Sequence, residues 1–219
     1  MKCRLPNNAI RQHALLLGRR LSFGFAFGIM LACAGCSSQP ARFVPPDIDA
    51  AAAGQAAIEL YDANHDGAIS GAELDQCPGI KNALPKYDAG GGKVTAESIA
   101  ARIRQWQESK IGSMGLNVIV SLDGQELEGA TIILDPEKFL GAEVLQASGT
   151  SGPYGMTPIR MKEKTGVQIG LYKVRVSKVV DGKETIPAKY NSATTLGIEV
   201  APSGGGPPAG IPTFQLKSK

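Results

Sequence analysis

Residues 62–73 have the sequence DANHDGAISGAE, and this stretch decides how the first part of the chain folds. Side chains that carry oxygen alternate along it, at Asp62, Asn64 and Asp66. Alternation directs their oxygens toward one point, and the glycine that follows permits a sharp turn that a side chain would obstruct. Glu73 offers two further oxygens at the end of the stretch. The spacing therefore predicts a loop that holds one divalent cation.

The spacing matches in full the pattern of the EF-hand calcium loop, D-x-[DN]-x-[DN]-G-x5-E. The predicted ligands are the side chains of Asp62, Asn64 and Asp66, the backbone carbonyl of Ala68, a water held by Ser70, and the carboxylate of Glu73. An oxygen-only set of this kind suits Ca2+ better than Mg2+. We expect Ile69 to point away from the ion into the core and His65 to face solvent.

An explanation without a metal exists for two of these residues. Ser70 and Glu73 also form a capping box for a helix that leaves the loop, and such a box needs no ion. The carboxylates of Asp62, Asp66 and Glu73 would nevertheless repel one another around an empty loop. A bound cation is therefore the simpler interpretation, with Ca2+ as the expected cofactor.

Helical patterns flank the predicted loop on both sides. Residues 47–61 are rich in alanine, and their apolar side chains recur at helical spacing. Residues 71–76 can begin another helix directly after the loop. Residues 96–110 form an amphipathic helical pattern that Thr95 can cap. The apolar face of this last pattern consists of Ile99, Ile103 and Trp106.

A second, decayed loop follows the first. Residues 87–99 have the sequence YDAGGGKVTAESI. Asp88 can stand at the first ligand position, but glycines replace the next two acidic positions, and Glu97 falls out of register. We expect a glycine-rich turn that keeps the packing of a hand pair rather than a second ion site. Dockerin modules also pair two calcium loops, but the spacing and the decayed second loop argue against that class.

Residues 1–35 have the features of a lipoprotein signal peptide. Residues 1–20 are basic, and residues 21–32, LSFGFAFGIMLA, form an apolar run that is too short to span a bilayer. The segment CAGCSS that follows resembles the bacterial lipoprotein signal, in which a peptidase cuts before an acylated cysteine. Cys36 is the predicted lipid-bearing residue, and Cys33 is the alternative. An ordinary signal peptide without a lipid is the remaining interpretation.

Processing before Cys36 changes the charge of the chain. The sequence has 23 Lys and Arg against 20 Asp and Glu, but the five basic residues before the cut are matched by no acidic one, which leaves 18 against 20. A chain with this balance has no global basic field, so we do not expect nucleic-acid binding. Residues 36–46 become a proline-rich tether to the membrane, and Cys77 remains as a single, buried thiol.

From Leu116 onward the pattern changes from helical to alternating. Apolar residues occupy every second position in short runs, at Leu116, Val118, Val120 and Leu122, at Tyr172, Val174 and Val176, at Leu196, Ile198 and Val200, and at Phe214 and Leu216. Asp123-Gly124 is a hairpin signal, and residues 129–134 form the next expected strand. Short strands between turn signals favour an antiparallel β-sandwich. For residues 137–168, the sequence predicts no definite helix or strand.

The run VIVSLDGQELEGATIIL, the strand GLYKVRVS and the segments IPAKYN and LGIEV resemble the carboxypeptidase regulatory-like, transthyretin-type β-sandwich. From about residue 47, the chain is similar to a family of bacterial lipoproteins that joins an EF-hand pair to this sandwich. The resemblance implies an α+β protein, with an EF-hand-like helical domain at residues 47–112 and an antiparallel transthyretin/Ig-like sandwich at residues 113–219. It implies little about function, because such sandwiches are usually accessory modules.

The processed sequence offers few residues for catalysis. His65 is then the only histidine, so neither a Ser-His-Asp nor a Cys-His arrangement is available, and no His/Cys cluster suits zinc. We therefore expect a non-catalytic, calcium-binding lipoprotein on the periplasmic or outer-membrane side of the cell envelope, whose β-domain binds a protein or a glycan. The alternative is a calcium-responsive accessory subunit of an envelope secretion or transport complex.

Overall fold

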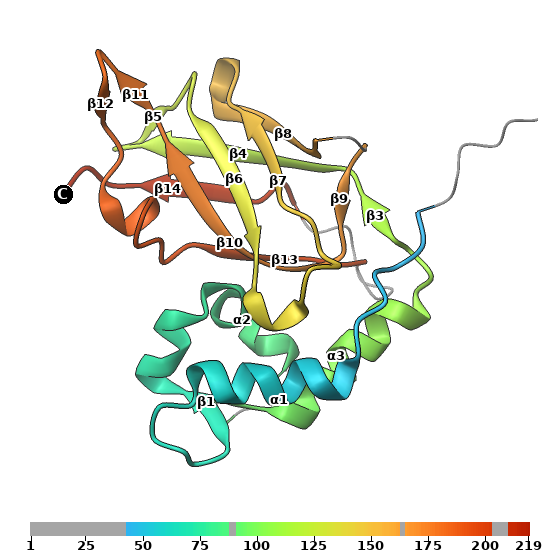
Figure 1. Cartoon of the computed structure of the whole chain (residues 1–219). Helices are drawn as coiled ribbons and strands as arrows, with labels where there is room; N and C mark the ends of the chain where they lie inside the picture. Colours follow the sequence, from blue (N-terminus) through green and yellow to red (C-terminus); the bar gives the residue numbers. More distant parts are fainter. Residues whose placement is uncertain (1–42, 88–90, 163–164, 203–209) are drawn as a thin grey trace, which may run out of the picture. The chain divides into compact units, whose positions relative to one another are not determined.

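The computed structural model describes residues 43–87, 91–162, 165–202 and 210–219. The predicted signal peptide, with Cys33 and Cys36, lies outside the described residues, and so does Asp88 of the predicted second loop. Within the described ranges, helices combine with a mainly antiparallel sheet (Figure 1), so the predicted α+β class is confirmed. Within the same ranges, no helix is long and apolar enough to cross a bilayer.

The helical elements begin at capping residues that the sequence supplies. α1 (Ala50–Tyr61) starts after Asp49, whose Oδ1 accepts two backbone N–H groups of the first turn at 3.0 Å each. α3 (Ala96–Glu108) starts after Thr95, whose hydroxyl accepts a first-turn N–H at 3.2 Å. The elements between these helices are β1 (Ala68–Ser70), η1 (Gly71–Gln76), α2 (Pro78–Ala83), η2 (Leu84–Lys86) and β2 (Lys93–Thr95).

The segment that leaves the predicted loop is tighter than a regular helix. Residues 71–76 form η1, a 3-10 helix that ends at Cys77. Pro78 explains the break, because proline has no N–H with which to continue the preceding turns. Its fixed φ suits the first position of a new helix, so α2 starts there.

α1 and α3 pack closely because Gly54 has no side chain. The predicted apolar face of α3 is confirmed, since Ile99, Ile103 and Trp106 are all buried. A Cβ atom on Gly54 would lie 2.3 Å from the carbonyl oxygen of Ala96, which is well inside van der Waals contact. The distance between α1 and the start of α3 therefore depends on this glycine.

The strands that follow form one sheet in the order β13-β10-β6-β7-β8-β4-β14. Their bounds are β4 Leu116–Leu122, β6 Thr131–Pro136, β7 Ala147–Thr150, β8 Met156–Met161, β10 Gly170–Ser177, β13 Gly197–Val200 and β14 Thr213–Leu216. Neighbours are antiparallel except β14 and β4, which run parallel, and this differs from the antiparallel arrangement we expected. β14 follows β13, which lies at the opposite edge of the sheet. No hairpin therefore links β14 to β4, and no turn imposes an antiparallel pairing.

Two predictions for the sheet are confirmed residue by residue. Asp123 and Gly124 have φ values of 52° and 82°, which suit a type I′ turn, and they join β4 to β5 (Gln125–Glu126). In β10, Tyr172, Val174 and Val176 are buried, while Lys173, Arg175 and Ser177 between and after them are partly exposed. The core side of β10 thus follows the alternation in the sequence.

Residues 137–168, for which the sequence predicts no definite elements, contain the strands β7 and β8 in the middle of the sheet. β7 has the sequence ASGT, so it lacks the alternation of apolar side chains that identifies strands. The remaining short elements are η3 (Lys138–Leu140), η4 (Pro153–Gly155), β3 (Ser113–Met114) paired with β9 (Val167–Gln168), the hairpin of β11 (Val179–Val180) and β12 (Lys183–Glu184), and η5 (Ala188–Tyr190).

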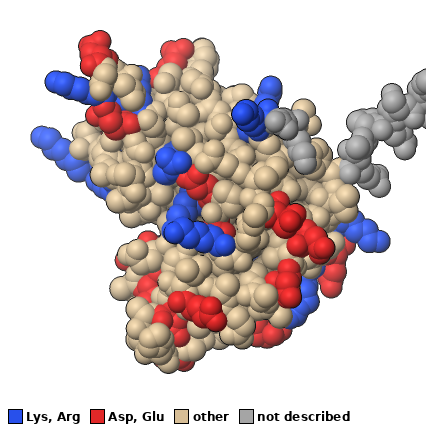
Figure 2. All heavy atoms as spheres, in the orientation of Figure 1, with Lys and Arg blue, Asp and Glu red and all other residues tan. Residues whose placement is uncertain are grey.

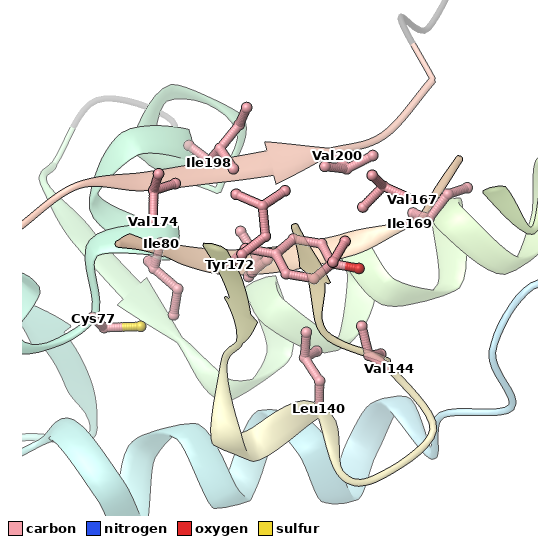
Figure 3. Close-up of a cluster of buried hydrophobic side chains, with 14 of the residues drawn as sticks. Cys77, Ile80, Leu140, Val144, Val167, Ile169, Tyr172, Val174, Ile198 and Val200 are labelled. Carbon is pink, nitrogen blue, oxygen red and sulfur yellow. The ribbon is translucent and has the colours of Figure 1, made fainter. Parts of the chain in front are cut away.

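The helical segment and the sheet share one apolar core, part of which Figure 3 shows. α2 packs against β13 and β10, and its Ile80 lies among Val174 and Ile198 of these strands. η3, which follows β6, contacts α1. The described residues form a single compact unit. The division near residue 112 into an EF-hand-like domain and a β-domain therefore stays a prediction.

Replacement of Gly54 by alanine tests the helix packing. We expect Gly54→Ala to lower the free energy of unfolding by about 1–3 kcal/mol, because the new methyl group overlaps the carbonyl of Ala96. Gly115→Ala is the matched control, since nothing lies within 4 Å of a Cβ atom there. Urea unfolding of both variants measures the difference, and equal stabilities would contradict the packing argument.

Candidate metal centre

The predicted calcium loop connects the end of α1 to the start of η1. Asp62 is the C-cap of α1, and its backbone N–H donates to the carbonyl of Ile58 at 2.9 Å. The chain then turns through two residues with left-handed backbone, His65 (φ 58°) and Gly67 (φ 85°). The glycine was expected to make this turn, whereas the left-handed His65 was not predicted. His65 is exposed, which confirms its predicted orientation.

The side-chain oxygens of the predicted ligands accept hydrogen bonds from the loop backbone. Asp62 accepts the N–H of Asp66 on Oδ1 at 3.2 Å and the N–H of Gly67 on Oδ2 at 2.8 Å. Asn64 Oδ1 accepts the N–H of Asp66 at 2.8 Å. Asp66 Oδ1 accepts the N–H of Ala68 at 3.0 Å. These bonds fix three alternating oxygen-bearing side chains against a single turn.

Glu73 ties the two ends of the loop together. Its Oε2 accepts the N–H of Ser70 at 3.0 Å, which is a contact of the predicted capping box. Its Oε1 accepts the N–H groups of Ala63 at 2.9 Å and Asn64 at 3.2 Å. A capping box does not explain these last two bonds, which reach across the loop to its first turn. Glu73 therefore closes the loop as well as capping η1.

The loop carries excess negative charge. In the described part of the chain, the basic side chain that pairs with it is Lys93, whose Nζ lies 3.1 Å from Asp66 Oδ2. The hydrogen bond from Lys93 lowers the pKa of Asp66. Asp62 is only 5% exposed, and no cationic side chain of the described residues pairs with it. A buried carboxylate without a cation is costly, and a bound ion would relieve that cost.

The donor set fits Ca2+ in its chemistry, because every predicted ligand offers oxygen. A carboxylate oxygen that accepts one N–H also retains a free lone pair. As the side chains stand, however, no three His, Cys, Asp or Glu side chains of the described residues gather in a group that could hold a metal ion. The carboxylates are directed at the loop amides, so coordination requires them to turn toward a common centre.

β1 pairs with β2, the strand that lies within the predicted second loop. Ile69 lies opposite Val94 of β2, and both are fully buried, so Ile69 points inward as predicted. Ala68 and Ser70 stand on either side of Ile69 at the ends of β1. Glu97 lies in the first turn of α3 and pairs with Arg104 at 3.1 Å. It is thus engaged along its own helix.

A buried carboxylate that the sequence did not single out lies near the loop. Glu137 follows β6 and is fully buried. It accepts hydrogen bonds from the hydroxyl of Tyr61 and from the N–H of Gly79, each at 3.0 Å. Burial raises the pKa of Glu137, and burial also raises the pKa of the Cys77 thiol beside it. Cys77 is a buried free thiol, as predicted.

A groove of about 600 Å3 lies between the two edge strands of the sheet. Residues 197–201 line one side and residues 210–214 the other. Residues 114–117, together with Asn82 and Lys86 of the helical segment, complete the lining. The antiparallel pairing of β13 with β10 directs the backbone groups of Glu199 away from β10. Edge strands of this kind can accept a further strand.

A smaller cavity of about 370 Å3 is polar and internally neutralised. Lys173, Arg175, Asp75, Asp135 and residues 191–195 line it. Arg175 pairs with Asp135, and Asp75 pairs with a lysine of α2. On the face of the molecule that Figure 2 shows, acidic and basic side chains are likewise interspersed. The cavity therefore offers matched charges rather than a field of one sign.

Comparisons with known proteins identify no relative of this chain. No family model matches the chain, and neither the curated proteins nor the solved structures contain a match.

The raised pKa of Glu137 predicts how stability changes with pH. The folded state holds this proton more tightly than the unfolded state, so the stability linked to Glu137 is complete at low pH and falls as pH rises through the folded-state pKa. We expect wild type to gain stability relative to Glu137→Gln as the pH falls from about 7 to about 4. Thermal unfolding of both proteins across that range measures this, and parallel profiles would contradict it.

Proposed function

We propose that this protein is a calcium-binding lipoprotein of the bacterial cell envelope that acts as a non-catalytic structural and interaction module. The observation that carries the proposal is the loop at residues 62–73. Its full ligand pattern stands between helical elements, its Glu73 reaches back to the first turn, and its Asp62 is buried without a cationic partner in the described residues.

The arrangement of the elements supports an EF-hand-like interpretation of residues 47–112. A helix enters the loop, a 3-10 turn leaves it, and the short antiparallel pair β1 and β2 joins the loop to the next turn. The following strands support the resemblance to a transthyretin-type sandwich through the I′ hairpin after β4 and the alternating strand β10. In this interpretation, calcium holds the helical part in place, and the β-domain presents a surface to a protein or a glycan.

The sequence supports a membrane anchor. The apolar run and the CAGCSS segment before the tether favour a lipid on Cys36, with Cys33 as the alternative. Acyl chains contribute about 0.8 kcal/mol per buried methylene, so a multiply acylated cysteine would hold the chain at an envelope membrane. We expect weak calcium binding, with a Kd of roughly 10⁻⁵ to 10⁻³ M. Extracellular sites are often weak, and the second loop of the predicted pair has lost its ligand pattern.

One observation favours the alternative of a calcium-responsive accessory subunit. Asn82 of α2 and Lys86 of η2 follow the loop and also line the groove between the edge strands. A movement of α2 on ion binding would therefore alter the groove. In that case calcium would change partner binding in a secretion or transport complex, rather than only stabilise the fold.

Calorimetric titration of the purified chain with Ca2+ tests the proposed site. We expect a saturable heat in wild type and none in Asp62→Ala, which removes the buried carboxylate. At about one hundred times Kd, calcium should add about 2.7 kcal/mol to the free energy of unfolding of wild type and nothing to that of the variant.

Asp75→Ala is the matched control for this titration. Asp75 is an exposed carboxylate of η1 that pairs with Lys81 outside the loop, so its loss should leave calcium binding unchanged. If wild type gives no heat of binding at millimolar calcium, or if wild type and Asp62→Ala give equal heat, the proposal is contradicted.

A dye that binds exposed apolar surface separates the two functions. If calcium is structural, its addition should raise the melting temperature without raising dye fluorescence. If calcium is regulatory, α2 should move and fluorescence should rise on calcium addition.

A further inference from the structure

The buried carboxylate of Glu137 contacts the helical segment on both sides of the proposed calcium loop. The hydroxyl of Tyr61 donates to its Oε2 at 3.0 Å, and Tyr61 immediately precedes Asp62, the first predicted ligand. The N–H of Gly79, in the first turn of α2, donates to its Oε1 at 3.0 Å. One side chain of the sheet segment thus holds the helix that enters the loop and the helix that follows its exit.

Lys173 of β10 reinforces both attachments. Its Nζ lies 3.7 Å from Glu137 Oε2 and donates to the carbonyl oxygen of Gln76, at the end of η1, at 2.9 Å. The same Nζ lies 5.4 Å from the centre of the Tyr61 ring, which is a cation–π distance. Phe139 packs edge-on against that ring, with the centroids 6.3 Å apart. Tyr61 is therefore fixed at its hydroxyl and on its ring.

We propose that Glu137, together with Lys173, is a positioning residue for the calcium loop. Glu137 sets the calcium affinity of the loop by fixing the end of α1 relative to η1 and α2. The inference depends on the proposed calcium site and deepens it. Asp62 and Glu73 are the first and last predicted ligands, so the distance between the flanking elements decides whether both reach one ion. A loop whose ends are already placed loses less conformational entropy on binding.

A different role for Glu137 is simple attachment of the helices to the sheet. Loss of a group that only attaches the helices would lower the free energy of unfolding by the same amount with and without calcium. It would leave the calcium Kd unchanged. A positioning residue must also weaken calcium binding when it is lost, because linkage makes the two effects reciprocal. The Kd, measured well below the melting temperature, therefore distinguishes the two roles.

The test is calorimetric calcium titration of the full chain and of Glu137→Ala. Partners that support metal ligands from outside the coordination shell typically change affinity by about 10–100-fold when lost. Glu137 touches no predicted ligand and acts through Tyr61 and Gly79, which flank the loop, so we expect the lower limit, a Kd about tenfold weaker. Glu137→Gln should be intermediate, because its amide oxygen can still accept the N–H of Gly79.

Asp135→Asn is the matched control. Asp135 lies two residues earlier, in β6, but pairs with Arg175 and Gln146 of the sheet segment. Among the described residues, it makes no hydrogen bond to the helices. Its loss should leave the calcium Kd unchanged. A second variant, Tyr61→Phe, removes one hydrogen bond of Glu137 while keeping the ring, and it should weaken calcium binding by a few-fold.

Each outcome decides the inference. An unchanged Kd in Glu137→Ala, with circular dichroism showing a folded protein, overturns the positioning role and leaves the calcium site standing. If Glu137→Ala does not fold, Glu137→Gln and Tyr61→Phe decide, and an unchanged Kd in both overturns the role. If wild type itself binds no calcium, the proposed function fails first, and the positioning role falls with it.

Discussion

Close contact between α2 and the edge of the sheet holds the helical segment in place. A Cβ atom on Gly197 of β13 would lie 2.0 Å from the carbonyl oxygen of Pro78, so only glycine permits this approach. α2 has six residues, which is too short for a helix to be stable by itself in water. Its stability comes from burying Ile80 against the strands. The same approach brings Glu137 and Lys173 within reach of the helices.

The loop and the buried carboxylate show two ways of placing negative charge. In the loop, Asp62 and Glu73 are satisfied by amide groups of one short turn, so the charge is concentrated and a cation can neutralise it. At Glu137, a hydroxyl, an amide and an ammonium group come from three distant segments. The first arrangement suits binding of an ion, and the second suits holding segments together.

Features set by neighbouring residues were predictable from the sequence. The turn at Gly67, the capping residue Thr95, the turn at Asp123-Gly124 and the alternation of β10 all follow from a few adjacent positions. Features set by distant segments were not. The burial of Glu137 depends on the helices meeting the end of β6, and the parallel pairing of β14 depends on a connection across the sheet. β7 was missed because its residues are small and polar.

The seclusion of Cys77 has a consequence for a protein proposed to function outside the cytosol. Compartments there favour disulfide formation, and an accessible lone thiol invites coupling between molecules. Cys77 has no exposed surface, and its sulfur points toward Ile80 (Figure 3). Because the thiolate is the species that reacts, and burial disfavours it, Cys77 of the folded chain is protected from oxidative cross-linking. Loss of the contact between α2 and the sheet would expose Cys77, so covalent dimers formed through Cys77 would mark unfolded chains.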